Sequence, residues 1–243
     1  MRLEGRNALV TGAGSGIGQA MAELFAKEGA NVAINDIEAE RLDETAALIE
    51  AQGRKALPLP FDVTDFAAVS DATSRAIAEL GHVDVLCANA GIAPTVDFVD
   101  MSEDAWDRMI KVHLYGAFYC CKAIVDHMIE RGHGRIIITA SMSAINGDIH
   151  LTHYSAAKAG QVGLARALAR ELCGTGVTVN VIAPGLTKTN ILGEVDDEVI
   201  EKYAPPIGRI GQPYDQAYAA LYLASEEGSF VTGHTLQVNG GAF

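Results

Sequence analysis

Apolar runs and amphipathic stretches alternate along this chain in a regular order. Short, uninterrupted apolar runs, as expected for strands buried on both faces, are followed by longer stretches with apolar residues at helical spacing. The predicted strands are 7–11, 31–35, 55–62, 83–88, 135–139, 177–182 and 235–238. The predicted helices are 19–28, 38–52, 64–80, 102–131, 154–172 and 213–224, and residues 186–206 form a partly helical insertion. A helix between successive strands predicts a parallel sheet covered by helices on both faces.

This order of elements predicts one domain of the α/β class. The expected fold is a Rossmann-like, doubly wound parallel sheet of about seven strands with helices on both faces. No linker, repeat or low-complexity stretch divides residues 1–243. The whole chain is therefore expected to fold as a single unit.

Composition and charge narrow the classes of function. The formal net charge is −13, and no run of basic residues is present to bind nucleic acid or an anionic membrane. Because the first residues lead directly into a strand, we expect no signal peptide, and no apolar run reaches the length of a membrane span. The cysteines lack the spacing of a metal or redox motif. They are Cys87, Cys120, Cys121 and Cys173. We therefore expect reduced cysteines that serve in packing, and a cytoplasmic location.

A glycine-rich loop follows the first predicted strand. Gly12, Gly16 and Gly18 precede a helix, where glycine permits a tight turn and lets backbone N–H groups approach a pyrophosphate. Asp36 ends the second predicted strand, and a carboxylate there can accept hydrogen bonds from an adenosine ribose and repel a 2′-phosphate. The same carboxylate could also cap the next helix. Neither the loop nor the position after Asp36 carries Arg or Lys, so the sequence predicts a dinucleotide site that prefers NAD to NADP.

A second group of reactive side chains lies farther along the chain. Ser141 follows the fifth predicted strand, and Tyr154 and Lys158 lie one turn apart on the same face of the next helix. A lysine ammonium beside a phenol favours the phenolate, so the pKa of Tyr154 is expected to fall toward physiological pH. A tyrosine tuned in this way can take a proton from an alcohol or return one to a ketone.

The sequence resembles the short-chain dehydrogenase/reductase family over essentially its whole length. The matching pieces are Thr11-Gly-Ala-Gly-Ser-Gly-Ile-Gly18, Asp62, Asn89-Ala-Gly91, Ser141, Tyr154-x-x-x-Lys158, Pro184-Gly185, Thr189 and the segment 231–241. The resemblance implies an oxidoreductase in which NAD exchanges a hydride with a carbinol carbon while Tyr154 moves the hydroxyl proton. Lys158 would lower the pKa of the tyrosine and bind the nicotinamide ribose, and Ser141 would hold the substrate oxygen. The chain up to about residue 90 would mainly bind the cofactor, and residues 91–243 would supply catalysis and substrate binding.

The resemblance also implies which residues hold each part of the cofactor. Asp62 and Val63 would hold the adenine, and Asn89 would stabilise the sheet beside it. Thr189 would bind the carboxamide, with Thr187 as a second candidate. The expected cofactor contacts are Gly12, Ser15, Gly16, Ile17, Gly18, Asp36, Asp62, Val63, Asn89, Ala90, Gly91, Tyr154, Lys158, Pro184, Gly185, Thr187 and Thr189.

One position departs from the family pattern. The family usually has an asparagine in the long helix as a fourth member of the catalytic set, and here His113 takes that place. The asparagine's role involves a water-held proton relay to the lysine. A histidine could keep that relay and add pH dependence, or it could be a hydrogen-bonded core residue. The expected catalytic set is therefore Ser141, Tyr154, Lys158 and His113.

The expected substrate-facing residues are mostly apolar, with a few polar anchors. They are Ser141, Met142, Ile149, His150, Leu186 and Tyr203. A small or medium secondary alcohol, polyol or ketone would suit such a pocket. His150 and His153 have His-x-x-His spacing, but no third ligand is evident, so we expect no metal.

Two alternatives remain open at this stage. A 3-oxoacyl-[acyl-carrier-protein] reductase would use NADPH and would need basic docking residues, for which Arg131 and Arg135 offer a small patch. A non-catalytic nucleotide-sensing module is less favoured, because the catalytic residues are intact. Members of the family commonly form homotetramers through their two long helices. Small residues in the Tyr154 helix and aromatic residues near Phe118 lead us to expect a homo-oligomer here, a tetramer or a dimer.

Overall fold

Seven parallel strands form the centre of the molecule. The computed structural model describes residues 1–189 and 204–242. Its strands are β1 (Asn7–Thr11), β2 (Asn31–Asn35), β3 (Ala56–Pro58), β4 (Val85–Ala88), β5 (Gly134–Thr139), β6 (Val177–Pro184) and β7 (Thr235–Val238). Their order across the sheet is β3-β2-β1-β4-β5-β6-β7. The strand order reverses between β1 and β4, and α/β sheets bind their ligands beside the carboxyl ends of strands at such a point.

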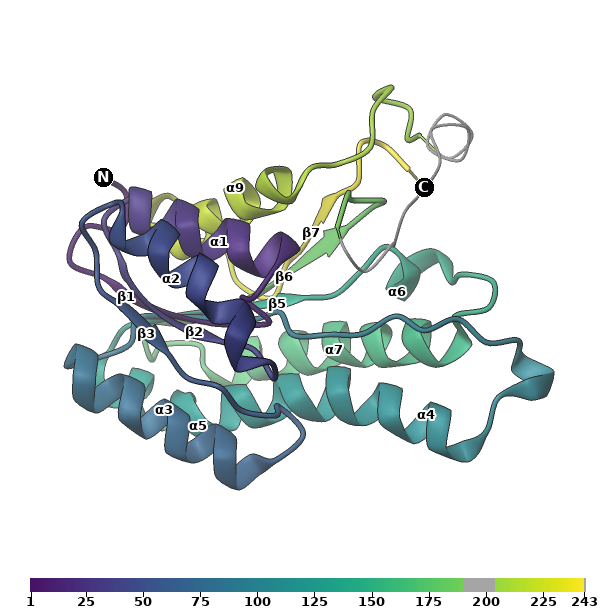
Figure 1. The fold of residues 1–243 in the computed structure, drawn as a ribbon, viewed down its shortest axis with the longest axis horizontal. Helices are drawn as coiled ribbons and strands as arrows, with labels where there is room; N and C mark the ends of the chain where they lie inside the picture. Colours follow the sequence, from purple (N-terminus) through teal and green to yellow (C-terminus); the bar gives the residue numbers. More distant parts are fainter. Residues whose placement is uncertain (190–203, 243) are drawn as a thin grey trace.

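Helices cover both faces of the sheet, as Figure 1 shows. One face carries α1 (Gly16–Lys27), α2 (Leu42–Glu50) and α9 (Pro213–Ala224). The other carries α3 (Phe66–Leu80), α4 (Glu103–Ile110), α5 (Gly116–Arg131) and α7 (Thr152–Glu171), and the short α6 (Ser143–Asn146) lies just before α7. Alternate strand residues serve the two layers, so that Leu9 packs under α3 and α5 while Val10 packs under α1 and α9. The predicted doubly wound, single-domain α/β fold is confirmed.

Most of the predicted elements begin and end within a few residues of the observed ones. β1, β2, β7 and α9 match their predicted bounds. The third strand is much shorter than the predicted 55–62, because Pro58 and Pro60 lack the N–H group that a strand ladder needs. A helical turn, Ala39–Arg41, precedes α2 and folds the chain back toward the end of β2. Of the predicted insertion, residues 190–203 lie outside the described residues.

The long helix predicted over 102–131 is continuous but not uniform. Ser102 is its N-cap, as predicted, and accepts a hydrogen bond of 3.1 Å from the Ala105 N–H. Between α4 and α5 the chain makes a π-helical turn over Lys111–Tyr115. Such a turn contains one residue more than an α-helical turn and is frequent at functional sites. Here it carries His113, which is only 2% exposed.

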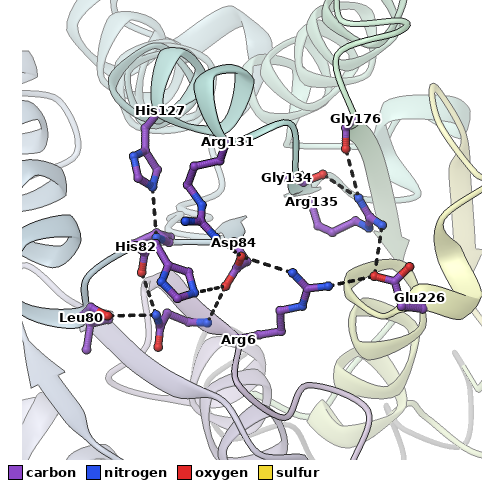
Figure 2. A network of polar contacts seen from close by, with 12 residues as sticks. Arg6, Leu80, His82, Asp84, His127, Arg131, Gly134, Arg135, Gly176 and Glu226 are labelled. Carbon is purple, nitrogen blue, oxygen red and sulfur yellow. Dashed lines mark hydrogen bonds and ion pairs between the residues drawn. The ribbon is translucent and has the colours of Figure 1, made fainter.

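A polar network closes the opposite end of the sheet, at the amino ends of the strands. Figure 2 shows Arg6 and Arg131 reaching the buried carboxylate of Asp84, each at 3.4 Å. His82 lies 3.0 Å from the same carboxylate, and the Asn7 N–H donates to it at 2.9 Å. The Asp84 side chain is fully buried, so these partners replace the water that a carboxylate requires.

Arg135 extends this network at the start of β5. Its side chain is 5% exposed and donates to the carbonyls of Gly134 and Gly176, at 3.0 and 3.3 Å. Glu226 lies 3.8 Å away and is also bound by Arg6 at 2.9 Å (Figure 2). The arginines at this end of the sheet therefore already serve the protein's own carboxylates and carbonyls.

Candidate active site

The glycine loop connects β1 to α1 at the carboxyl edge of the sheet. Gly12 and Gly16 have positive φ angles of 63° and 56°, a region that favours glycine. A β-carbon on Gly18 would lie 2.1 Å from the carbonyl oxygen of Gly12, so the loop can fold back on itself only with glycine there. Ser15 is the N-cap of α1, and its side chain makes no capping hydrogen bond with any described residue. The first N–H groups of α1 are thus available to a phosphate, as a dinucleotide requires.

Asp36 stands at the end of β2 and faces this loop. Its Oδ2 accepts a hydrogen bond of 3.1 Å from the Gly14 N–H, and its Oδ1 accepts one of 3.2 Å from the Glu38 N–H. The helix-capping role left open by the sequence is wrong, because Glu38 is the N-cap of the next helical turn and Asp36 bonds only within the turn before it. Two oxygens have further lone pairs, so the carboxylate can still accept from ribose hydroxyls.

Arg41 also lies against the glycine loop. The sequence did not predict this position of Arg41. A β-carbon on Gly14 would be 2.6 Å from Arg41 Cβ and 2.7 Å from Asp36 Oδ2. The helical turn before α2 brings Arg41 there, and its Nε lies 2.9 Å from Glu38 Oε2. Neither the loop nor the position after Asp36 carries a base, as the sequence indicated, but the fold brings Arg41 against Gly14 from farther along the chain.

The end of β4 is tied to the glycine loop. Asn89 Nδ2 donates to the carbonyls of Thr11 and Gly12 at 3.1 and 3.3 Å, and the Ala90 N–H donates to the Thr11 hydroxyl at 3.1 Å. Asn89 therefore holds two strand ends together, as the resemblance implied.

The two residues expected at the adenine follow β3. Asp62 Oδ1 accepts a hydrogen bond of 2.8 Å from the Thr64 N–H, which shapes the turn. Val63 is buried, and a β-carbon on Gly116 would lie 2.9 Å from its Cγ2. Gly116, the first residue of α5, thus lies close to the turn that contains Asp62 and Val63.

Tyr154 and Lys158 share one face of α7, as the spacing predicted. Lys158 Nζ lies 5.4 Å from the centre of the Tyr154 ring and donates a 2.6 Å hydrogen bond to the Thr139 carbonyl. Ser141 follows β5 and bonds to the tyrosine. The structure brings these three side chains together at the carboxyl end of the sheet.

The direction of the tyrosine's pKa shift is opposite to the prediction. Burial lowers the pKa of Lys158 to about 7, so near neutral pH the lysine carries only part of a charge. Burial raises the pKa of Tyr154; the hydrogen bond from Ser141 lowers it, and the charge of Asp148 raises it further. A phenolate therefore forms readily only when Lys158 is protonated, which couples the titrations of the two groups.

His113 packs edge-on against Tyr154, with ring centres 5.1 Å apart. Its Nε2 lies 2.7 Å from the Ile92 carbonyl oxygen and 3.2 Å from the Ile92 nitrogen, so either tautomer has a partner there. Burial and the nearby Lys158 charge hold its pKa well below 6.5, so it is neutral at pH 7. His113 is thus a hydrogen-bonded core residue, as one of the two interpretations has it, and its part in a proton relay stays a prediction.

Two further residues define the surroundings of His113. A β-carbon on Gly91 would lie 2.4 Å from His113 Cε1, so glycine is required for the ring to fit. Gln161 of α7 donates from Nε2 to the His113 carbonyl at 2.9 Å. Sequence analysis missed Gln161; its place on the Lys158 face of α7, one turn farther on, is the only signal.

The two threonines considered for the carboxamide differ in availability. Thr187 is buried; its hydroxyl donates to the Gly185 carbonyl at 2.9 Å and accepts from Gln216 at 3.2 Å. Thr189 is half-buried and borders the glycine loop, since a β-carbon on Gly16 would lie 3.2 Å from its Cγ2. The geometry favours Thr189. Pro184 ends β6 beside the residues that follow Ser141. Its carbonyl accepts a hydrogen bond of 3.0 Å from the Met142 N–H.

The residues expected at the substrate differ in how far they are buried. Met142 is buried, whereas Ile149 is 82% exposed. His150 has a positive φ of 61° and its Nδ1 bonds to Asp97. Leu186 is half-buried, and Tyr203 lies outside the described residues. Of the expected cofactor contacts, Ile17 belongs to the first turn of α1 and packs against the core.

A cleft of about 620 Å³ opens beside the glycine loop. It joins the loop to Thr189 and to the first residues of α9. Its lining residues are Gly14, Ser15, Gly16, Gln19, Ala20, Glu23, Glu40, Arg41, Glu44, Lys188, Thr189, Pro213 and Tyr214. The glycine loop and Thr189 therefore share one cleft, and Asp36 borders it through its hydrogen bond to Gly14.

Known proteins share this arrangement over the whole chain. A family model described as enoyl-(acyl carrier protein) reductase matches residues 12–242. A short-chain type dehydrogenase/reductase of Mycobacterium marinum superposes with a TM-score of 0.93 at 35% identity, covering 98% of this chain and 95% of that one. The chain belongs to the short-chain dehydrogenase/reductase family. It is an oxidoreductase of this family, which acts on CH–OH groups with NAD(P).

Individual members of the family differ in substrate. The 3-oxoacyl-[acyl-carrier-protein] reductase FabG of Thermotoga maritima is 38% identical and covers 99% of each chain. A (2S)-[(R)-hydroxy(phenyl)methyl]succinyl-CoA dehydrogenase subunit, BbsD of Thauera aromatica, is 41% identical, covering 99% of this chain and 98% of that one. The L-rhamnose 1-dehydrogenase (NAD(P)+) of a Sphingomonas species is 38% identical, covering 99% and 97%.

Two further observations concern partners and cysteines. Within residues 1–189 and 204–242, no helix combines the length and apolar character needed to cross a bilayer. All four cysteines are free thiols. Cys87, Cys120 and Cys121 are buried, as expected of packing residues, whereas Cys173 is exposed and does not fit that expectation.

Proposed function

We propose that this protein is an NAD-dependent dehydrogenase that interconverts a secondary alcohol or polyol with its ketone. The observation that carries the proposal is the meeting of Ser141, Tyr154 and Lys158 at the same sheet edge as Asp36. Ser141, Tyr154 and Lys158 can together transfer a proton to or from a carbinol oxygen. Asp36 selects the dinucleotide.

The chain's own residues divide the work of the reaction. Tyr154 takes the hydroxyl proton of the alcohol in oxidation and returns it in reduction, while Ser141 donates a hydrogen bond to the substrate oxygen as negative charge develops there. Lys158 supplies the charge that makes the phenolate accessible, and the Thr139 carbonyl fixes its Nζ at 2.6 Å. The bound cofactor supplies or accepts the hydride.

The preference for NAD rests on the charge beside Gly14. A 2′-phosphate placed next to Asp36 would meet a carboxylate already held toward the loop. Two bases line the cleft, Arg41 and Lys188. Arg41 is the one that lies against Gly14, and Glu38 pairs with it at 2.9 Å. We infer that the acidic pair outweighs Arg41, so NAD is the better cofactor.

The names of two relatives of this chain support the alternative, a 3-oxoacyl-[acyl-carrier-protein] reductase. The contacts of Arg131 and Arg135 argue against it. FabG proteins of Thermotoga maritima and Escherichia coli are 38% and 37% identical. Arg131 and Arg135, the proposed docking patch, are instead engaged by Asp84, Glu226 and backbone carbonyls. With those charges balanced internally, an acidic carrier protein gains little from them.

The state of assembly and location are part of the proposal. Exposed aromatic rings of Phe66, Tyr115 and Phe118 cluster with Tyr119 over α3 and α5, with ring centres 5.2 to 5.7 Å apart. We propose that this face is covered in a homodimer or homotetramer, because such apolar surface favours burial. The four free cysteines favour a reducing compartment such as the cytoplasm.

The direct test is formation of reduced nicotinamide by the purified protein. A panel of secondary alcohols and polyols is offered with NAD and NADP in parallel. We expect NAD to be used better, and Tyr154→Phe to lower kcat about 10²-fold or more, since that is the usual contribution of a general acid–base group. Asp36→Ala is expected to shift the NADP to NAD ratio of kcat/KM toward NADP by about tenfold.

The control for Asp36 is Asp43→Ala, which removes an exposed carboxylate of α2 and should leave cofactor preference unchanged. Better use of NADP by the wild-type protein would overturn the NAD assignment and favour the carrier-protein reductase. Turnover that survives in Tyr154→Phe would remove the proposed proton transfer.

A further inference from the structure

A chain of hydrogen bonds leads from the catalytic serine to a carboxylate. The Ser143 N–H donates to Ser141 Oγ at 3.1 Å, and the two serine hydroxyls lie 3.0 Å apart. The Ser143 hydroxyl in turn donates to Asp148 Oδ2. Ser143 is 5% exposed, whereas Asp148 lies in the exposed loop between α6 and α7.

The loop that carries Asp148 is itself fixed to the catalytic helix. The Asp148 N–H donates to the Ser155 hydroxyl at 3.3 Å, and Ser155 directly follows Tyr154. At the other end, the Ile145 and Ala144 N–H groups bond to Met142 and Ser141 carbonyls and hold α6 as a compact turn. The carboxylate therefore has a defined position relative to both Ser141 and Tyr154.

Counting protons shows what this arrangement imposes on Ser141. A serine hydroxyl has one hydrogen, and an ionised carboxylate has none to give. Once Ser143 donates to Asp148, its oxygen can only accept, so it offers Ser141 an acceptor together with a backbone N–H donor. Both contacts orient the Ser141 oxygen without placing another hydroxyl proton against it. The single Ser141 proton lies toward Ser143 when nothing else accepts it, and it turns to the substrate oxygen when substrate binds.

We propose that Ser143 and Asp148 are positioning residues for the catalytic serine, with Asp148 fixing the hydroxyl of Ser143 and Ser143 fixing the oxygen of Ser141. The inference rests on the proposed proton transfer at Ser141 and Tyr154. Neither residue needs to touch the substrate for this role. Nothing in the sequence pattern predicted this role for Ser143 or for Asp148.

The position of Asp148 has a second effect, on the proton of Tyr154. The titratable groups facing this tyrosine in the described structure are Lys158 below its ring, His113 at its edge, His153 beside His113, and Asp148. The two histidines have lowered pKa values and are neutral at pH 7. Asp148 thus supplies the only fixed negative charge among them, which disfavours the phenolate and raises the pKa of Tyr154.

The experiment compares Asp148→Asn and Ser143→Ala with the wild-type protein. The first readout needs no substrate: the near-ultraviolet absorbance of phenolate is titrated in each protein and in its Tyr154→Phe counterpart, and the difference reports Tyr154 alone. Asp148→Asn should ionise Tyr154 at lower pH than the wild-type protein, and Ser143→Ala, which keeps the carboxylate, should not. Asp71→Asn, an exposed carboxylate of α3, is the matched control.

The second readout is turnover. Both variants should lower kcat by about tenfold, the worth of one well-placed hydrogen bond, with the KM for NAD unchanged. In Asp148→Asn the acid limb of alcohol oxidation should also move to lower pH. Ser143→Thr, which keeps the hydroxyl, should recover most of the kcat lost in Ser143→Ala.

The outcomes separate this inference from the proposed function. An unmoved Tyr154 titration in Asp148→Asn overturns the inference whether or not a substrate has been found. Wild-type-like kcat in Ser143→Ala does the same where turnover is measurable. Absence of turnover in the wild-type protein counts against the proposed function alone, and the titration then still decides the role of Asp148.

Discussion

At the scale of single residues, the site depends on pairs that occupy each other's space. Gly91 leaves room for the His113 ring, and Gly18 leaves room for the Gly12 carbonyl. In each pair the glycine has no function of its own. It permits a neighbour to adopt the position that the chemistry needs.

The Gly91 and His113 pair gives a prediction about stability. Gly91→Ala should destabilise the fold by about 1–3 kcal/mol, the usual cost of overpacking, because the methyl group must displace His113 Cε1 or the backbone. Denaturant unfolding measures this cost. The double variant Gly91→Ala, His113→Ala should lose less than the sum of the two single losses, since removal of the ring relieves the clash. Strict additivity would show that the two side chains do not compete for the same space.

At the scale of elements, the helical run from α4 to α5 is built in three pieces. Its start is fixed by Ser102 and two acidic residues in the first turn, its centre is the π-helical turn, and its end is Gly132 with a positive φ of 66°. The π-helical turn also packs closely on α7, since a β-carbon on Gly160 would lie 3.0 Å from Leu114 Cδ2. The run thereby brings His113 and Tyr154 together from two helices.

The cap of this run is testable separately from the active site. Ser102→Ala removes the acceptor of the Ala105 N–H and should lower the free energy of unfolding by about 1 kcal/mol, with kcat unchanged. Ser74→Ala is the control: its hydroxyl bonds only to the Ser70 carbonyl one turn back within α3, so this change should be close to neutral. Equal losses in both variants would refute a specific capping role.

At the scale of the whole molecule, buried histidines set the response to acid. His113, His127, His133 and His153 all have pKa values below the 6.5 of an exposed histidine, chiefly because of burial. Between 6.5 and these lower values the unfolded chain binds protons that the folded protein does not. The contribution of these histidines to stability is therefore fully present above pH 6.5 and is lost as the pH drops below it.

Unfolding free energies measured at a series of pH values above and below 6.5 should show this loss. His113→Asn, which removes the histidine whose pKa lies well below 6.5, should give a shallower dependence on pH. The carboxylates with lowered pKa values, Asp215 and Glu227, lose their contributions only below about pH 4.5, so they do not obscure the histidine range. A variant as steep as the wild-type protein would mean that His113 does not contribute.

Most of the fold could be predicted from the sequence, because local patterns of apolar residues determine its strands and helices. Apolar runs and the helices between them identify the sheet, and the spacing of Tyr154 and Lys158 survives as geometry because a helix fixes it. The position of Arg41 could not be predicted, because it depends on how a helical turn folds back over the loop. The pKa of Tyr154 was mispredicted because burial of both partners is a property of the packed protein.

The π-helical turn has a consequence for insertions and deletions in this chain. Deleting one residue between Lys111 and Tyr115 would allow α4 and α5 to join as one regular helix, so the backbone itself would tolerate the loss. The two halves would then be rotated against each other by about 100°, the angle per residue of an α-helix. His113 would turn away from Tyr154. A deletion that makes the helix more regular would therefore remove the contact between these two side chains.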